Sequence, residues 1–372
     1  MNMRIALVGG GTGGHFNPLI AVAEVAEQNP EKPDLYYIGP SPYEPKLLEK
    51  HNIKYVWCPA GKIRLYFSLQ NLIDPFRTFF GVFVALWKLY FLYPDVIFSK
   101  GGFTSVPVLL AARFYRIPVV IHESDAIPGR ANKMANKFAK YIAISYDDTV
   151  KFFPPEKTAL TGIPVRSEVK TKIPDPFSVL QIPNDLPLIY ITGGSLGAER
   201  INNLVLRSLD ELLPNYRIFH QTGAAHQDEL LLTAQSLITN PKLQSRYYIR
   251  GNIDAKTVNA VMSAASLVIT RAGSTTLFET ALHGKPSIVI PIPEDISRDQ
   301  RTNAYTYARS GAATVIEEHN LTETLLTAEI NTIIGNPEHS QKMSQAALNF
   351  AQTDAAEKIS NILIQIGTEH GS

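Results

Sequence analysis

The stretch that decides the fold is Val8-Gly9-Gly10-Gly11-Thr12-Gly13-Gly14-His15, which directly follows the apolar residues of a predicted strand, Arg4–Val8. We expect a helix to open just after it, at Asn17 and Pro18. Glycine accepts positive φ and lets a ligand approach without a Cβ in the way. The N-terminus of the following helix offers unpaired N–H groups and a positive dipole end. Five glycines in six positions exceed what a tight turn needs, so this turn predicts a site for a phosphate or carbonyl oxygen.

Length and composition bound the possibilities. The chain has 372 residues, 45% of them hydrophobic, and 25 prolines, which predicts two domains rather than one core. No charged leader with an apolar segment and cleavage site precedes Arg4, so we expect a cytoplasmic protein. The single cysteine, Cys58, excludes an internal disulfide framework and a cysteine-rich metal site. Its apolar neighbours predict a buried strand position.

Charge is uneven along the chain. Residues 1–165 carry 18 Lys+Arg and 13 Asp+Glu, while the remainder carries 17 and 21. This difference is too small for a nucleic-acid-binding surface, so no nucleic-acid partner is expected. It suits an amino-terminal half that meets an anionic surface or substrate.

Short apolar runs alternate with helical patterns throughout the first half. The runs predict strands at residues 4–8, 34–39, 54–58, 95–99, 118–122 and 141–145. This alternation is typical of an α/β, doubly wound parallel sheet, whose ligands bind beyond the carboxyl ends of the strands. Two of those ends carry unusual residues: Lys100-Gly101-Gly102-Phe103-Thr104-Ser105 and His122-Glu123-Ser124-Asp125.

Residues 62–93 combine aromatic and basic side chains with one acid, Asp74. No uncharged apolar run here approaches the roughly 20 residues that span a bilayer, so a transmembrane helix is not expected. Part of the stripe must pack on the sheet. The composition also describes an element that sinks into anionic lipid, which we favour. The residues predicted for this membrane patch are Arg64, Arg77, Phe79, Phe80, Trp87 and Lys88.

Prolines become dense between residues 152 and 187, which predicts a linker and a domain boundary. The same plan then restarts with an apolar strand at Leu188–Thr192, a second glycine-rich turn at 193–198 and a helix from Glu199. Further strands are expected at residues 217–220, 246–249, 266–270, 287–291 and 313–316, and an amphipathic helix at 354–366. The chain therefore holds two Rossmann-like halves.

A third loop, residues 270–279, follows a strand in the second half. Ser274 is expected to cap a helix that ends at Gly284, which places Glu279 near its second turn. Glu279 could be a surface residue or a carboxylate that binds a ribose diol. Arg271 could likewise be solvated or could hold the loop and a phosphate.

Gly9-x-Gly11-x-x-Gly14 matches the dinucleotide fingerprint formally, so a nicotinamide oxidoreductase is one candidate. That class needs an acid at the end of the second strand, where residues 37–41 have none. Two glycine-rich turns, with a ribose-binding acid available only in the second half, fit better with an enzyme that grips a sugar nucleotide in a cleft between domains.

Several motifs together carry a family resemblance. They are Gly10-Gly11-Thr12-Gly13-Gly14-His15, Lys100-Gly101-Gly102, His122-Glu123, Gly162-Ile163-Pro164-Val165-Arg166, Gly193-Gly194-Ser195, and Arg271-Ala272-Gly273-Ser274-Thr275-Thr276 through Glu279. In order and combination, the chain to about Ala304 resembles the MurG family of peptidoglycan N-acetylglucosaminyltransferases, glycosyltransferase family 28.

The resemblance implies a GT-B fold, with two Rossmann-like domains facing across a cleft. Residues 1–165 would bind the acceptor and the membrane, residues 166–351 the donor, and residues 352–372 would pack back on the first domain. The implied reaction transfers GlcNAc from UDP-GlcNAc to lipid I, an undecaprenyl-linked muramyl-pentapeptide, with inversion. It would occur at the cytoplasmic face of the plasma membrane, with an anionic membrane surface as a further partner.

The resemblance also assigns residues. Donor contacts fall on Arg166, Gly194, Ser195, Ile249, Arg271, Ser274, Thr275, Glu279 and Gln300, with Glu279 on the ribose, Ser195 on the diphosphate and the backbone near Ile249 on uracil. Acceptor contacts fall on Thr12, Gly13, Gly14, Gly101, Gly102 and Asp125.

Inverting transfer needs a group that takes the proton of the attacking hydroxyl. We rank His15 first as this general base, because His suits catalysis near pH 7, and Glu123 second. No Asp-x-Asp pair is placed to bridge a diphosphate to a cation, so no metal and no cofactor are expected.

The chain departs from the family pattern in three places. Asp125 stands where Asn is usual, Leu196 replaces a common Gln, and Arg298-Asp299-Gln300 differs from the usual run before Gln. A carboxylate at 125 would repel an acceptor diphosphate unless it were paired or protonated. Two alternatives therefore stay open: a related transferase to another lipid acceptor such as diacylglycerol, and a soluble UDP-GlcNAc epimerase.

Overall fold

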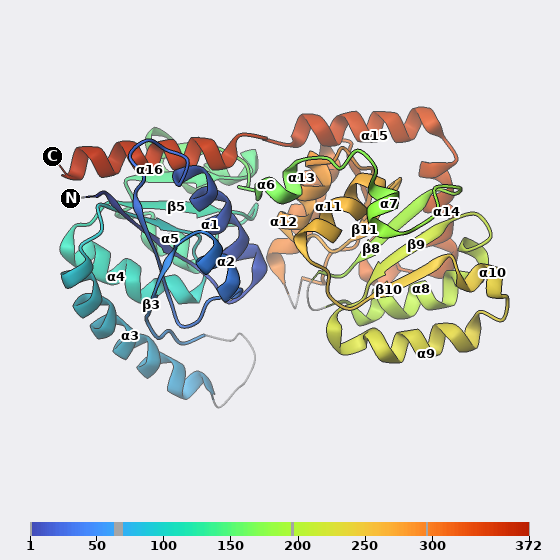
Figure 1. The fold of residues 1–372 in the computed structure, drawn as a ribbon, viewed down its shortest axis with the longest axis horizontal. Helices are drawn as coiled ribbons and strands as arrows, with labels where there is room; N and C mark the ends of the chain where they lie inside the picture. Colours follow the sequence, from blue (N-terminus) through green and yellow to red (C-terminus); the bar gives the residue numbers. More distant parts are fainter. Residues whose placement is uncertain (1, 63–69, 195–196, 295–296, 372) are drawn as a thin grey trace. The chain divides into compact units, whose positions relative to one another are not determined.

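The computed structural model describes residues 2–62, 70–194, 197–294 and 297–371, and for residues 70–72, 298 and 371 only the backbone. Arg64, Ser195 and Leu196 therefore lie outside the described residues. The chain forms two compact units, Met1–Arg166 with Gln352–Ser372, and Ser167–Ala351 (Figure 1). Arg166 thus belongs to the first unit, one residue beyond the boundary placed from the sequence.

The first unit is built on a seven-stranded parallel sheet of order β3-β2-β1-β4-β5-β6-β7. The strands are β1 (Arg4–Val8), β2 (Asp34–Gly39), β3 (Lys54–Trp57), β4 (Val96–Ser99), β5 (Val119–Glu123), β6 (Tyr141–Ile144) and β7 (Thr158–Leu160). Six of them confirm the predicted strands to within a residue. The domain boundary predicted within residues 152–187 is confirmed, between Arg166 and Ser167. The stretch is not a plain linker, because the edge strand β7 and the short helices α6 (Ser167–Lys170) and α7 (Pro176–Leu180) lie within it. A three-residue edge strand tolerates the neighbouring prolines that suggested a linker.

Alternate residues of the central strands face opposite layers of helices. Ile5 and Leu7 pack with α1 and α16, whereas Ala6 and Val8 pack with α3 and α4. Because both faces are covered, the strands are apolar along their whole length. Figure 1 shows α16 lying along α1. The helices of this unit are α1 (Gly13–Ala26), α2 (Pro45–Lys50), α3 (Gln70–Leu92), α4 (Val106–Tyr115), α5 (Arg130–Ala135) and α16 (Ala355–Gly371).

Helix α1 begins at Gly13, not at Asn17 and Pro18 as predicted. Gly11 turns the chain at φ +93°, Thr12 is the extended N-cap, and Pro18 lies inside the helix. Proline at that depth removes the hydrogen bond to the carbonyl four residues earlier, and its ring crowds that carbonyl. The first-turn N–H groups therefore belong to the glycine-rich stretch itself.

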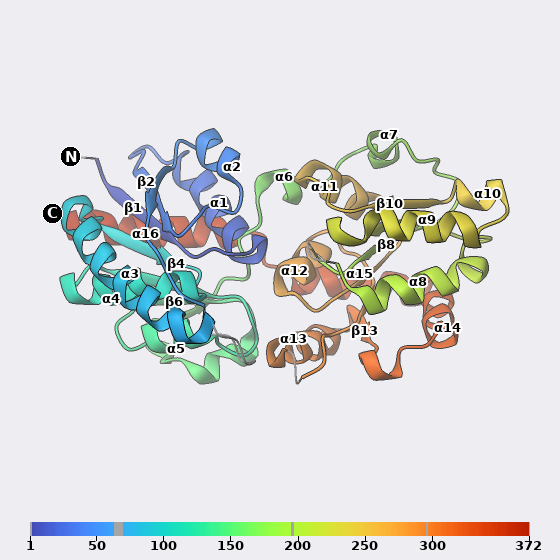
Figure 2. The same cartoon turned by 90° about the horizontal axis from the view of Figure 1, so that it is seen from below.

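The second unit repeats the plan with a six-stranded parallel sheet of order β10-β9-β8-β11-β12-β13. Its strands are β8 (Leu188–Thr192), β9 (Arg217–Gln221), β10 (Tyr247–Arg250), β11 (Leu267–Thr270), β12 (Ser287–Val289) and β13 (Ala313–Val315). Ile189 and Ile191 pack with α8 and α14, whereas Leu188 and Tyr190 pack with α11. Figure 2 shows α8 and α11 on either side of β8.

The helices of the second unit alternate with its strands, as in the first. They are α6 (Ser167–Lys170), α7 (Pro176–Leu180), α8 (Glu199–Leu212), α9 (Gln227–Leu237), α10 (Pro241–Gln244), α11 (Ala255–Ala264), α12 (Ser274–Leu282), α13 (Arg298–Arg309), α14 (Glu323–Ile334) and α15 (Pro337–Phe350).

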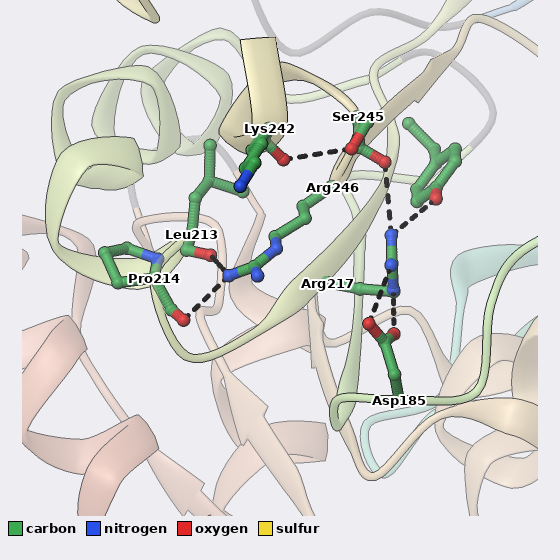
Figure 3. Close-up of polar contacts among 8 residues, drawn as sticks. Asp185, Leu213, Pro214, Arg217, Lys242, Ser245 and Arg246 are labelled. Carbon is green, nitrogen blue, oxygen red and sulfur yellow. Dashed lines mark hydrogen bonds and ion pairs between the residues drawn. The ribbon is translucent and has the colours of Figure 1, made fainter. Parts of the chain in front are cut away.

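A polar cluster secures the amino-terminal end of the second sheet (Figure 3). Arg217, the first residue of β9, binds both carboxylate oxygens of Asp185, at 2.6 and 3.1 Å. The same guanidinium donates to the Ser245 carbonyl at 3.1 Å and to the Tyr248 hydroxyl at 2.8 Å. Arg246 donates to two carbonyls at the end of α8. These contacts tie the strand starts to the loops that precede them.

Only one side of helix α3 packs against the core of the first unit. Ala85 and Leu89 are buried against the sheet, and Asp74 is buried and paired with Arg77. Among the described residues, Ile73–Leu92 is long and apolar enough to cross a bilayer by length and composition, which the sequence pattern did not predict. Cys58 is buried as expected, and burial raises the pKa of its thiol to about 12.

Candidate active site

In both units the glycine-rich turns lie where the strand order reverses. β1 and β4 are neighbours in the first sheet, with Val8 opposite Ser99, and β8 and β11 are neighbours in the second, with Thr192 opposite Thr270. The loops predicted from the sequence follow each of these four strands. In doubly wound sheets, ligands bind outside the carboxyl ends of the strands at this point.

The two loops of the first unit contact each other. Gly9 has φ +136°, and a Cβ placed on it would lie 2.9 Å from the Cβ of Lys100. A Cβ on Gly102 would lie 3.4 Å from the His15 ring. His15 Nδ1 pairs with the Thr12 hydroxyl at 3.0 Å. Among the described residues His15 Nε2 has no hydrogen-bond partner, so this nitrogen can meet a ligand.

The environment keeps His15 neutral. Burial, followed by the nearby charge of Lys100, lowers its pKa to about 4, and the charge of Asp125 opposes this shift. A neutral imidazole at pH 7 can accept a proton, as a general base must.

Glu123 holds its own loop together. Its buried carboxylate accepts from the N–H groups of Asp125 at 3.1 Å and Gly129 at 2.9 Å, and from the Asn132 amide at 2.9 Å. Burial, followed by the charge of Asp125, raises its pKa to about 7. The hydrogen bonds use both oxygens, so the geometry favours a loop-holding carboxylate over a proton acceptor.

Lys100 is a buried cation that the residue-by-residue prediction left out of the site. It follows β4 directly and is 3% exposed. Its ammonium donates to His122 Nδ1 at 2.7 Å and to the Ser124 hydroxyl. His122 Nε2 in turn lies 2.8 Å from the Gly162 carbonyl, which assigns the proton to Nε2. A lysine directly after an apolar strand was the available signal.

Side chains of β8 and β9 support the glycine-rich turn of the second unit by hydrogen bonds. Gly194 N–H donates to the Thr192 hydroxyl at 3.0 Å, and this hydroxyl and that of Tyr190 both donate to Gln221. Gly194 has φ +85°, and a Cβ there would meet no atom of the described residues within 4 Å. Its backbone is therefore open to a ligand. The predicted diphosphate contact at Ser195 lies outside the described residues.

The N-terminus of α12 is the second open backbone in this unit. Gly273, not Ser274, is the N-cap, and Ser274 is the buried first residue of the helix. The prediction followed the usual preference for Ser at an N-cap, but here the glycine takes the extended conformation. A Cβ on Gly273 would meet nothing within 4 Å. Thr275 and Glu279 are half-buried on the first two turns.

Arg271 supports this loop. Its guanidinium donates to the carbonyls of Ile290 and Pro291, each at 3.2 Å, and pairs with Glu318. These partners favour the loop-holding interpretation of Arg271 that the sequence left open. Glu318 was not predicted, because nothing local links it to a residue 47 positions earlier.

The remaining predicted donor residues, Gln300, Ile249 and Arg166, lie in three different segments of the chain. Gln300 lies on α13, where its buried Oε1 has no hydrogen-bond partner among the described residues. Asn303 of the same helix donates to the Ala272 carbonyl, which fixes α13 beside the α12 loop. Ile249 is on the edge strand β10, and Arg166 is half-buried at the end of the first unit's main segment.

The described residues contain no group of three or more His, Cys, Asp or Glu side chains arranged to hold a metal ion.

Two parallel α/β units, each with a glycine-rich turn where the strand order reverses, are the architecture of the GT-B class. The chain belongs to glycosyltransferase family 28: the N-terminal domain of that family matches residues 5–144 and the C-terminal domain matches residues 188–359. The fold prediction is thereby confirmed, and the nicotinamide oxidoreductase reading is set aside.

Relatives match over nearly the whole chain. A Bacillus cereus protein named UDP-N-acetylglucosamine–N-acetylmuramyl-(pentapeptide) pyrophosphoryl-undecaprenol N-acetylglucosamine transferase 2 is 38% identical, covering 90% of this chain and 92% of its own. A Clostridium kluyveri protein with the same activity in its name is 34% identical over 97% and 98%.

Solved structures agree with this assignment. The crystal structure of Acinetobacter baumannii MurG has a TM-score of 0.74 at 26% identity, covering 98% of this chain and 99% of that one. A Neisseria meningitidis UDP-GlcNAc 2-epimerase has a TM-score of 0.69 at 14% identity, with coverage of 98% and 100%, and shares the fold alone.

Proposed function

We propose that this protein transfers GlcNAc from UDP-GlcNAc to the muramyl sugar of lipid I, which makes lipid II for peptidoglycan. The observation that carries the proposal is the match to transferases named for this reaction over at least nine-tenths of the chain. The two family domains that match the chain include both glycine-rich turns. The epimerases share only the fold, so they do not support the alternative function.

The donor binds the second unit in this proposal. The open backbones of Gly194 and Gly273 meet the UDP diphosphate, helped by the positive ends of α8 and α12. Glu279 accepts hydrogen bonds from the ribose hydroxyls. Because helix dipoles and N–H groups supply the positive potential, no metal ion takes part.

The acceptor binds the first unit, with its diphosphate at the first glycine-rich turn. His15 Nε2 accepts the proton of the acceptor hydroxyl as its oxygen attacks the anomeric carbon of GlcNAc. The bond from that carbon to the diphosphate oxygen breaks, and UDP leaves with the electron pair. The positive end of α8 stabilises the charge that develops on UDP.

The first unit also contacts the membrane, at the cytoplasmic face. One side of α3 presents apolar side chains that are 55–75% exposed: Ile73, Phe76, Phe79, Phe80, Phe83, Trp87, Tyr90 and Phe91. Arg77 flanks this α3 aromatic face, and Lys88 lies over the Trp87 ring at 5.1 Å. Exposed aromatics with basic neighbours favour insertion into an anionic lipid surface.

A transfer assay with labelled UDP-GlcNAc tests the proposal. We expect label in lipid I and none in diacylglycerol presented in the same vesicles. Transfer to diacylglycerol alone would assign a different lipid acceptor. Formation of UDP-ManNAc without transfer, by protein that does not pellet with liposomes, would support the epimerase alternative.

A further inference from the structure

We propose that Gln221 is a further donor-binding residue, whose side-chain amide donates a hydrogen bond to the diphosphate of UDP-GlcNAc beside Gly194. This inference rests on the proposed function, which puts the donor diphosphate at Gly194. Gln221 is not among the donor residues predicted from the sequence. Its amide would add a side-chain contact to the backbone groups and helix ends already assigned to the diphosphate.

Gln221 lies at the edge of the second sheet where the donor site is proposed. It is the last residue of β9, and in the sheet it lies opposite Thr192, the last residue of β8. Ligands of doubly wound sheets bind outside these carboxyl ends. The Gln221 side chain therefore ends β9 beside the turn that follows β8.

The residue after Gln221 contacts the glycine-rich turn directly. A Cβ on Gly197 would collide with the carbonyl oxygen of Thr222. The Asn202 amide of α8 donates to the same oxygen at 3.1 Å. The end of β9 is thus packed against the turn and the first part of α8, and Gln221 is one residue from this contact.

The contacts of Gln221 give its two polar atoms different roles. Oε1 accepts from the Tyr190 hydroxyl at 2.6 Å and from the Thr192 hydroxyl at 3.1 Å. The Thr192 oxygen accepts from the Gly194 N–H at 3.0 Å, so the hydroxyl proton of Thr192 is available for Gln221. Two donors satisfy the amide oxygen, and the amide nitrogen lies on the other side.

The amide nitrogen keeps its N–H groups available for a ligand. Gln221 is only 9% exposed, and within the described part of the chain its Nε2 has no hydrogen-bond partner. A nearly buried donor without an acceptor is costly, which favours a ligand that supplies one. A diphosphate offers several oxygen acceptors, and its charge strengthens the hydrogen bonds that it accepts.

The test is a double-mutant cycle on the full-length protein with Gln221→Met, Thr192→Val and the double variant. Thr192→Val removes the support of Gly194 and leaves the amide, whereas Gln221→Met removes the amide. The readouts are calorimetric Kd values for UDP and for uridine, which lacks the diphosphate. Gln235→Met, which replaces an exposed glutamine of α9, is the matched control, and the melting temperature reports folding.

We expect Gln221→Met to raise the Kd for UDP about 10- to 100-fold and the Kd for uridine less than about threefold. Thr192→Val should raise the Kd for UDP only about 2- to 5-fold. Because the amide contacts the ligand directly, adding Gln221→Met to Thr192→Val should weaken UDP binding by at least about tenfold more. A glutamine that only supported the turn through Thr192 would cause no such further loss.

Equal UDP affinity of the double variant and Thr192→Val would overturn the inference. A loss of uridine binding as large as that of UDP would also overturn it. If Gln221→Met fails to fold, the isosteric Gln221→Glu decides, because it keeps acceptor oxygens for the Tyr190 and Thr192 hydroxyls. Its UDP binding, relative to wild type, should be weak at pH 8 and partly regained at pH 5.5, where a protonated carboxyl can donate. A loss that does not change with pH, or no loss, contradicts the inference.

The binding measurements need no turnover, so they separate this inference from the proposed function. Wild-type protein whose UDP affinity depends on Gln221 but which transfers nothing to lipid I would refute the proposed function and leave the inference standing. Transfer to lipid I by protein whose UDP affinity does not depend on Gln221 would refute the inference and leave the proposed function standing.

Discussion

Arg217 and Lys100 are both buried cations at the end of a β-strand, yet their surroundings differ. Arg217, 6% exposed at the start of β9, has a bidentate carboxylate partner, a carbonyl and a hydroxyl (Figure 3). The Asp185 contact raises its pKa. Lys100, 3% exposed just past the end of β4, touches two neutral acceptors, and burial lowers its pKa to about 8.

The surroundings of the two cations differ according to which end of the strand each one occupies. At the amino end of β9, the charge of Arg217 is paired with Asp185, and this contact helps to hold the fold. At the carboxyl ends, His15 is kept neutral, the Lys100 ammonium contacts two neutral acceptors, and a Cβ on Gly194 would meet no described atom within 4 Å. Parallel strands bring all of their loops with ligand-facing groups to one edge of a sheet.

The largest expected effect tests the carboxyl end of β1. His15→Ala should lower kcat about 10²- to 10⁴-fold, because the acceptor hydroxyl loses its proton acceptor, while UDP-GlcNAc affinity stays near wild type. Steady-state kinetics with saturating lipid I measures the change. A variant with wild-type kcat would remove His15 from the chemistry and leave it as a cap on the turn.

Glu279→Ala tests the carboxyl end of the second sheet. Loss of a charged acceptor to the two ribose hydroxyls should weaken UDP binding about 10- to 100-fold by calorimetry. Glu338→Ala, which removes an exposed carboxylate on α15, is the matched control and should bind UDP like wild type. Equal affinity in the two variants would show that Glu279 does not hold the ribose.

The next prediction concerns the α3 aromatic face and its proposed contact with the membrane. Replacing Phe79 and Phe80 by Ser and Arg77 by Glu should lower binding to anionic liposomes at least about tenfold. Turnover of a soluble acceptor should not change. Exchanging the exposed Leu231 and Leu232 of α9 for Ser is the control. If the α3 variant unfolds, the result would indicate that the α3 aromatic face belongs to the core and is not a membrane-binding surface.

Arg217→Met tests the structural role of Arg217, and its expected effect is smaller than those of the preceding variants. The variant loses the Asp185 and Tyr248 contacts, so its melting temperature should fall by about 5 °C. Its kinetic constants should stay within about twofold of wild type. Altered kinetics at an unchanged melting temperature would contradict the structural role of Arg217.

The sequence predicted what is local. Apolar runs located nearly all strands, and glycine-rich or polar residues after them located the loops at both reversal points, because period and turn chemistry act over a few residues. The start of α1 was misplaced because Pro18 looked like a first helical residue. Strand β7 was missed because the dense prolines around it suggested a linker.

Contacts between distant segments could not be predicted in the same way. Lys100 meets His122, Glu123 meets Gly129 and Asn132, and Arg271 meets Glu318 only after the sheets have formed. These contacts decide which side chain is a proton acceptor and which is a support. The sequence therefore named His15 and Glu123 together, and the hydrogen bonds of Glu123 distinguish them.

The pH dependence of kcat/KM for lipid I tests this distinction most directly. A general base must be unprotonated, so activity is lost as the pH falls through its pKa in the free enzyme. With His15 as the base, at a pKa of about 4, kcat/KM should hold from pH 7 to about pH 5 and fall only near pH 4. With Glu123, at about 7, it would drop roughly tenfold per pH unit below neutrality. An acidic limb near pH 4 that disappears in His15→Ala supports His15, and a limb near pH 7 that survives in that variant contradicts it.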